Sequence, residues 1–340
     1  MITHNYTPFP SLDFESANVR GEDFQVFILR GTFHLDDDGP LKPAREQESL
    51  VYADQYFGDP GASSVRMESD LAPFKPNTDV HVIADAHAPA GRPARSGVVW
   101  VRVGPMEKRL RVTGPRSWER GRVGLWRLSE PEPCLSVPIR YEHAYGGIWR
   151  ADDKQDVYEE NPVGVGHVRP RSSRLPDRLP APQLEAVDEP VTTFGRPYRP
   201  VGFGPIGRAW QPRLRLAGTY DETWVQGRWP RLPLNFDFAH YNGAHPDLIV
   251  PHHLRGDEPI ELEGLHPTGT LRSRLPGYHV YLLRRYEDGM ILPAPMALDT
   301  LVLDVPRRRA YLVWRGQVPL TPPIRLAELR MVVGEEVSRG

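Results

Sequence analysis

Proline and glycine interrupt the whole chain at short intervals. The 340 residues include 37 prolines and 30 glycines, and the proline share is about twice the usual ~5%. Because proline fixes φ and lacks a backbone N–H, it interrupts helices and the interior of sheets. Between these residues the sequence alternates apolar and polar side chains over short runs, which is typical of β-strands. The chain is therefore expected to be all-β or β-dominated, with many short strands and few short helices.

Three β-hairpins are predicted from apolar runs that flank short turns. The paired runs are residues 97–103 with 108–113, 279–285 with 290–292, and 300–304 with 309–314. A further strand is predicted over residues 234–239, where apolar and polar residues alternate. Residues 212–229 form the most helix-like segment, because Thr219 or Asp221 is a suitable N-cap and Pro230 would end a helix.

The composition changes between residues 151 and 190, where arginine and proline are enriched. A segment of this kind is typical of an ordered connection between two folded parts. We therefore expect an N-terminal β-rich half over residues 1–150, a Pro/Arg-rich connecting segment over 151–190 and a C-terminal β-rich half over 191–340. Both halves are expected to be β-sandwich-like.

Charge, hydropathy and cysteine content exclude several classes of partner and compartment. The net charge is −2, which gives no electrostatic footprint for nucleic acid. No apolar run approaches the ~20 residues of a membrane span, and the N-terminus lacks the pattern of a signal peptide. Cys134 is the single cysteine, so no intrachain disulfide forms, as is usual in a reducing compartment. We expect a cytoplasmic protein that binds neither nucleic acid nor membrane.

Aspartate and histidine alternate in one short segment, which raises the question of a metal site. On an extended strand these residues share one face; they are Asp79, His81, Asp85 and His87. Asp79 and His81, taken with His143, motivate a metal-dependent hydrolase as an alternative function. No zinc-type spacing or nucleophile elbow accompanies them, so no catalytic, metal-binding or cofactor-binding residue is assigned and no cofactor is predicted. Aromatic residues on β-loops leave a carbohydrate-binding β-module as another alternative.

The most distinctive tract is residues 69–80, in which two prolines enclose Phe74 and Lys75. Each proline fixes its own φ and keeps the preceding residue out of the helical region, so the tract is expected to be extended and stiff. We predict a brace between strands, with Phe74 packed inward and with Asp70 and Asp79 closing turns. The alternative is that this tract forms an edge on which a partner docks.

Five blocks in a fixed order resemble one bacterial family. They are Ser69–Val80, Ala86–Pro89, Tyr141–Gly147, Glu160–Gly166 and Ala217–Trp224. Together they extend over most of the chain and are similar to the family named domain of unknown function 2169.

The resemblance implies a non-catalytic adaptor or chaperone of the type VI secretion system. Such a protein binds a type VI effector in the bacterial cytoplasm and assists its loading, with PAAR or VgrG spike proteins as further partners. The family has no established catalytic residues, so the matching positions are motif residues of unassigned role. These are Asp70, Pro73, Phe74, Lys75, Pro76, Asp79, His143, Tyr145, Gly146, Gly147, Asn161, Pro162, Gly164, Gly166, Gly218, Tyr220, Asp221 and Trp224.

Overall fold

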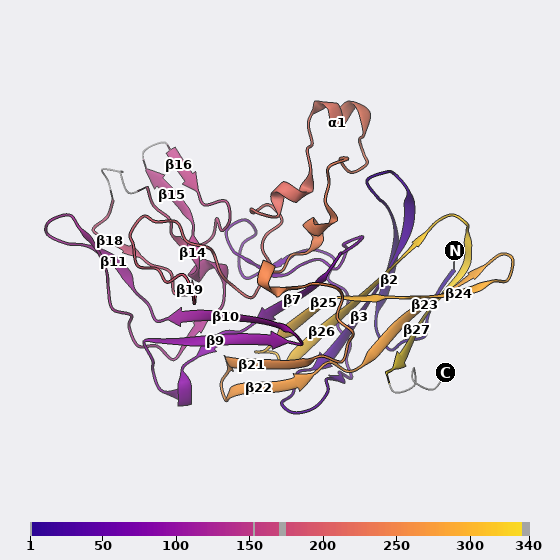
Figure 1. Cartoon of the computed structure of the whole chain (residues 1–340), viewed down its shortest axis with the longest axis horizontal. Helices are drawn as coiled ribbons and strands as arrows, with labels where there is room; N and C mark the ends of the chain where they lie inside the picture. Colours follow the sequence, from indigo (N-terminus) through magenta and orange to yellow (C-terminus); the bar gives the residue numbers. More distant parts are fainter. Residues whose placement is uncertain (1, 152–153, 170–174, 335–340) are drawn as a thin grey trace.

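The protein is strand-dominated, as predicted (Figure 1). This computed structural model describes residues 2–151, 154–169 and 175–334. Its largest sheet has seven strands. They are β2 (Ser11–Ala17), β3 (Asp23–His34), β26 (Arg309–Pro319), β25 (Ala297–Asp304), β7 (Thr78–Ile83) and β20 (Ile249–Val250) in spatial order, with β4 (Lys42–Pro43) paired to β3. Neighbours are antiparallel except β25 and β7, which are parallel.

Two further sheets complete the main body. The five-stranded sheet has the order β19 (Leu184–Ala186), β10 (Met106–Thr113), β9 (Ser96–Val103), β21 (Pro259–His266) and β22 (Gly269–Arg274). The four-stranded sheet has the order β1 (Ile2–Asn5), β27 (Ile324–Val333), β23 (Tyr278–Tyr286) and β24 (Ile291–Pro295). The three predicted hairpins are confirmed as the pairs β9–β10, β23–β24 and β25–β26.

Both ends of the chain contribute to the same sheets. β3 pairs with β26, and β9 pairs with β21, although the paired strands of each pair are more than 150 residues apart in sequence. One continuous buried cluster accordingly includes Phe33, Leu110, Leu262, Trp314 and Leu329. The segment over residues 151–190 therefore does not separate two independent sheets, because strands from both expected halves share one core.

Most of the described residues between 115 and 200 form a lobe beside this core. Its strands are β11 (Ser117–Arg120), β12 (Trp126–Leu128), β14 (Tyr145–Gly146), β15 (Ile148–Ala151), β16 (Lys154–Val157), β17 (Val165–Gly166) and β18 (Arg178–Pro180). A separate buried cluster joins Trp118, Tyr145 and Tyr198. The described part of the predicted connecting segment is thus folded into this lobe, apart from β19, which belongs to the five-stranded sheet. Residues 152–153 and 170–174 lie outside the described residues.

Short elements connect the sheets. They are β5 (Gln55–Tyr56), β6 (Val65–Met67), β8 (Asp85–His87), β13 (Ser136–Pro138) and the 3₁₀ turns η1 (Pro89–Gly91), η2 (Tyr141–His143) and η5 (Pro246–Leu248). No helix among the described residues is long and apolar enough to cross a membrane.

Prolines on the outer strand β24 explain part of the unusual composition. Met296 N donates to Val280 O, and Tyr286 N donates to Met290 O. Because hydrogen-bonding positions alternate in an antiparallel pair, Pro293 and Pro295 lie in the phase that faces away from β23. Their missing N–H groups leave that edge poor in donors, which opposes pairing with another chain.

An arm projects from the body and carries the one α-helix of the described residues (Figure 1). It contains η3 (Leu214–Ala217), α1 (Glu222–Gly227) and η4 (Phe238–Tyr241). The Asp221 side chain accepts from Trp224 N, which confirms the predicted N-cap. The predicted strand over residues 234–239 is wrong: the Asp237 side chain accepts from Ala239 N and starts the 3₁₀ turn η4 instead. An Asx-type bond of this kind favours a turn over an extended strand.

Candidate functional site

The proline-bracketed tract is held by buried charges. Arg30 Nη1 of β3 lies 3.1 Å from both carboxylate oxygens of Asp70. Asp70 Oδ2 also accepts from Val51 N at 2.7 Å. Arg315 Nη1 of β26 donates to the carbonyls of Asp70 and Ala72 at 2.9 and 2.5 Å. Asp70 therefore anchors the tract to the seven-stranded sheet, whereas the sequence predicted that it closes a turn.

Lys75 and Asp79 form a second buried ion pair. Lys75 Nζ lies 2.8 Å from Asp79 Oδ2 and donates to Thr300 Oγ1 at 3.0 Å. The Asp79 carboxylate also accepts from Asn242 Nδ2 and from Gly243 N, at 3.0 and 2.9 Å. Burial raises the pKa of Asp79, but the Lys75 charge and these hydrogen bonds outweigh it and hold the pKa below its usual value. Asp79 thus joins the tract to the loop that follows the arm.

Arg213 connects the base of the arm to the same network. Its Nη1 lies 2.6 Å from Glu68 Oε1, and its Nε and Nη2 donate to the carbonyl of His240 at 3.0 and 2.8 Å. Arg213 and His240 belong to the two legs of the arm, so one buried guanidinium fixes both legs to the residue before the tract. No spacing pattern predicts this contact, because Glu68 and Arg213 are 145 residues apart.

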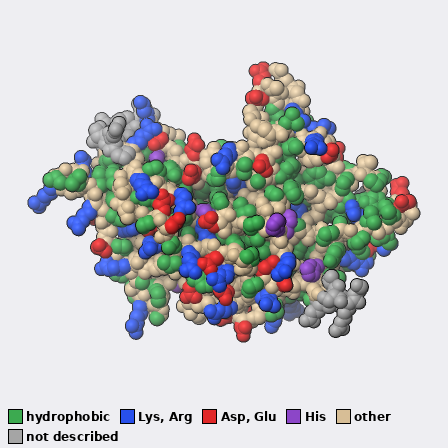
Figure 2. All heavy atoms as spheres, viewed as in Figure 1, with side chains coloured by type: hydrophobic (Ala, Val, Ile, Leu, Met, Phe, Trp, Pro, Cys, Tyr) green, Lys and Arg blue, Asp and Glu red, His purple; other side chains and the backbone are tan. Residues whose placement is uncertain are grey.

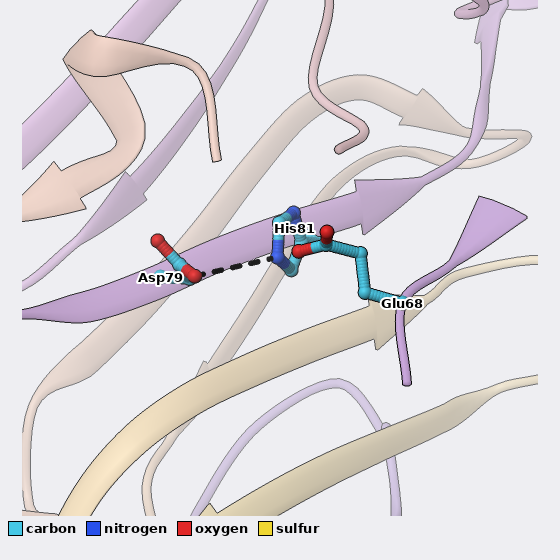
Figure 3. Close-up of side chains that lie close together, drawn as sticks. All are labelled: Glu68, Asp79 and His81. Atoms are coloured by element: carbon cyan, nitrogen blue, oxygen red, sulfur yellow. Dashed lines mark ion pairs between the residues drawn. The ribbon is translucent and has the colours of Figure 1, made fainter. Parts of the chain in front are cut away.

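Glu68, Asp79 and His81 are the described residues that come closest to a metal-ligand set (Figure 3). Their candidate ligand atoms lie within 4.8 Å of one another, and His81 Nε2 is 4.0 Å from Asp79 Oδ2. Burial lowers the pKa of His81 to about 4 despite the opposing charge of Asp79. Neither ring nitrogen has a hydrogen-bond partner among the described residues.

This arrangement does not fit a divalent cation well. Each carboxylate is already paired with a cation, Asp79 with Lys75 and Glu68 with Arg213. A metal ion would have to bind next to both of these positive charges in a site closed to solvent, which is electrostatically unfavourable. The donor set is better suited to an internal ionic brace.

The other residues considered for metal chemistry lie elsewhere. Asp85 and His87 belong to β8, which pairs with β13 rather than continuing β7. His143 Nδ1 lies 3.1 Å from Gln183 Oε1. The adjacent Glu142 bonds to Ser64. The structure therefore brings together Asp79 and His81, but not His143.

The Tyr141–Gly147 and Glu160–Gly166 blocks pack tightly on each other. Asn161 Nδ2 donates to the carbonyls of Tyr141 and Tyr145 at 2.8 and 3.0 Å. Gly146 has φ +149°, and a Cβ there would overlap the Asn161 carbonyl oxygen. β14 and β17 run parallel at this point, with Gly146 opposite Gly166. These motif residues have a structural role in closing the lobe against the main body.

The same packing accounts for the remaining residues of these two blocks. Gly147 and Gly164 come so close that a Cβ on Gly147 would meet the Gly164 carbonyl oxygen. Pro162 follows the buried Asn161 and is itself half-buried. Close backbone approach of this kind requires glycine and leaves no space for a bound phosphate.

Phe74 differs from its neighbours because it faces a groove. The groove has a volume of about 710 Å³ and is lined by Asn18, Glu22, Asp23, Phe24, Phe74, Phe238, Gln317, Pro319 and Thr321. The Phe74 and Phe238 rings meet edge to face, with centroids 5.8 Å apart and an interplanar angle of 69°. Phe74 is half-buried, while Pro73 behind it is buried and its carbonyl accepts from Gln317 Nε2 at 2.6 Å. The buried charges and Pro73 therefore make the tract a brace between strands, whereas Phe74 forms part of the surface.

The arm beside this groove exposes large apolar side chains. Val225 is 57% exposed, and Trp229 and Leu234 are each 69% exposed. Tyr220 is 50% exposed and packs edge to face on Trp224 at 4.7 Å. Figure 2 shows the arm standing clear of the surrounding surface. Apolar groups concentrated on a projecting element mark an interaction site more often than a structural one.

The arm is also fixed at its base and along its side. Gly218 has φ +80°, and the adjacent Thr219 N donates to Asn235 Oδ1 at 3.0 Å across the two legs. Arg228 donates to Val19 O at 2.5 Å, which joins the arm to the β2–β3 hairpin. The sequence singled out Gly218, Tyr220, Asp221 and Trp224 but missed Trp229, Leu234 and Phe238. The sequence signal for these three residues is that they lie in a segment rich in aromatic side chains, which would ordinarily be expected in the core.

Comparisons with known proteins give one match. No curated protein and no solved structure matches this chain. One family model, described as "Uncharacterized protein conserved in bacteria (DUF2169)", matches residues 20–315. This range includes all five sequence blocks, the buried ionic brace, the arm, and Phe74 with part of the groove that it lines. The chain therefore belongs to the bacterial DUF2169 family.

Proposed function

We propose that this protein is a non-catalytic adaptor or chaperone that binds a type VI secretion effector in the bacterial cytoplasm. It would assist loading of the effector onto the VgrG/PAAR spike. The type VI assignment rests on the family resemblance, while the mode of action rests on the structure of the Phe74 groove and the arm.

The observation that carries the proposal is the position of Phe74. An aromatic side chain is presented in a groove by a backbone that two prolines and two buried ion pairs hold in place. A rigid binding element loses little conformational entropy on association, so more of the contact energy appears as affinity. Aromatic anchors such as Phe74 and Trp229 are also typical of binding hot spots.

The alternatives receive less support from the geometry. A metal-dependent hydrolase through Asp79 and His81 would use carboxylates that are already neutralised by buried cations. A carbohydrate-binding module typically presents coplanar aromatic rings, whereas Phe74 and Phe238 meet at 69°. An aromatic groove beside an apolar arm suits a polypeptide better than either ligand.

Co-purification with a neighbouring effector tests the proposal. The full chain with an affinity tag is co-expressed with the effector encoded beside it, and the captured effector is quantified. We expect capture by the wild type, loss with Phe74→Ala and retention with Tyr52→Ala. Tyr52 is 60% exposed and lines neither the groove nor the arm, so it controls for loss of an exposed aromatic. Failure of the wild type to capture any adjacently encoded effector or spike protein would contradict the proposal.

A further inference from the structure

The groove at Phe74 combines aromatic walls with an acidic rim. Phe24, Phe74 and Phe238 supply three rings, and Glu22 and Asp23 supply two carboxylates. Lysine and arginine are absent from the described residues that line it. This combination favours a cationic group over a purely apolar one, because aromatic faces and carboxylates both attract positive charge.

The acidic rim belongs to an ordered turn. Asn18 Oδ1 accepts from the backbone N–H groups of Arg20 and Glu22, and Asn18 Nδ2 donates to Glu22 Oε2 at 2.7 Å. Neither Glu22 nor Asp23 forms a salt bridge with a lysine or arginine of the described chain. Asn18 thus holds the Glu22 carboxylate at the groove, and neither carboxylate is used in an ion pair of the described chain.

A second hollow, of mixed charge, adjoins the groove. It has a volume of about 370 Å³, lies beside the arm, and is lined by Glu15, Ser16, Ala17, Asp23, Pro73, Pro230, Arg231, Leu232 and Tyr241. Asp23 and the proline-bracketed tract border both hollows. A ligand that occupies both is extended and passes over the β2–β3 hairpin next to Asp23.

We infer that the groove binds an extended segment of the effector that carries a lysine or arginine flanked by apolar residues. The cationic group lies between the phenylalanine rings and the carboxylates of Glu22 and Asp23, and the apolar neighbours contact Pro319 and the second hollow. This inference rests on the proposed adaptor function and adds the chemistry of the recognised segment.

Short synthetic peptides test this inference without the effector. Labelled peptides of alternating leucine and serine carry arginine, lysine, citrulline or glutamate at the centre, and their binding to the full chain is measured by fluorescence anisotropy. Citrulline keeps the shape of arginine but removes its charge. We expect the arginine peptide to bind at least about tenfold more tightly than the citrulline peptide, with weakening at higher salt.

Matched variants test whether the groove residues cause the preference for arginine. The double variant Glu22→Gln/Asp23→Asn should remove the preference for arginine, and Phe74→Leu should reduce it while an apolar contact remains. The control variant Glu46→Gln/Glu287→Gln makes the same charge change at exposed positions outside the groove and should behave as wild type. Thermal unfolding confirms that every variant is folded.

The outcomes separate the inference from the proposed function. Equal affinity for the arginine and citrulline peptides, or an unchanged preference after loss of both carboxylates, overturns the inference. If the effector still co-purifies in that case, the adaptor function stands. If arginine peptides bind through Glu22 and Asp23 but no effector co-purifies, the binding chemistry stands and the adaptor function fails.

Discussion

Replacing His81 with leucine should remove a defined part of the acid sensitivity of the protein. The ring is buried, its pKa is lowered to about 4, and its nitrogens have no partner among the described residues. Replacing the histidine with leucine therefore breaks no hydrogen bond of the described chain, and leucine has a similar volume. We expect His81→Leu to be folded and close to wild type in stability at about pH 7.5.

The sign and size of the effect follow from the two states of the histidine. An unfolded histidine takes up a proton near its ordinary pKa of 6.5, whereas folded His81 remains neutral down to about 4. The stability that this group contributes is thus fully present above about pH 6.5 and is lost as the pH falls toward 4. Each pH unit in this window corresponds to about 1.4 kcal/mol, so at about pH 5 the wild type has lost about 2 kcal/mol through His81 alone.

Urea unfolding at about pH 7.5 and about pH 5 measures this difference. The free energy of unfolding should fall by about 2 kcal/mol less in His81→Leu than in the wild type over that interval. His4→Leu, at an exposed position, controls for the removal of a histidine as such. Glu68 and Asp79 have lowered pKa values, so the stability they contribute is lost at lower pH than this window. Equal losses in wild type and variant would refute the reasoning, because they would indicate that the pKa of His81 is the same in the folded and unfolded states. A smaller loss in the wild type than in the variant would refute it too, and would indicate a folded imidazolium paired with Asp79.

Three further predictions test the brace, the packed lobe and the arm. Lys75→Met leaves the Asp79 carboxylate buried without its cation and should lower the free energy of unfolding by about 3–5 kcal/mol. Adding Asp79→Asn to this variant should cost less, because the unpaired charge is then gone. A loss below about 1 kcal/mol in urea unfolding of Lys75→Met would contradict a buried ion pair. Gly146→Ala places a methyl group against a backbone carbonyl and should lower the thermal midpoint by several degrees, while Gly97→Ala, where a Cβ meets nothing within 4 Å, should not. Trp229→Ala should change the free energy of unfolding by no more than about 0.5 kcal/mol, because the side chain is 69% exposed, yet it should weaken effector capture in the pull-down; normal capture would exclude the arm from binding.

Local features of the fold were predictable because they depend on neighbours in sequence. Two hairpins were predicted from apolar and polar side chains that alternate on either side of Gly104 and of Asp288. Both the turn and the alternation of side chains between the two faces of a strand are set by residues a few positions apart. The Asp221 cap of α1 was predictable for the same reason, because its bond spans three residues. The error at residues 234–239 also has a local cause: Asp237 bonds to Ala239 N, and a turn results from a sequence that alternates like a strand.

The sequence by itself determined a strand-rich chain, a stiff tract at residues 69–80 and the blocks that identify the family. Only the tertiary structure decided what these parts do. The charges of the tract are buried because partners more than 200 residues away, Thr300 and Arg315, approach it across the sheet. Phe74 faces outward because its neighbours Pro73 and Lys75 are fixed inward, and Phe24 and Phe238 reach the same groove from distant segments. Sequence periodicity carries no information on such long-range pairings, because they depend on how strands from both ends of the chain assemble into one core.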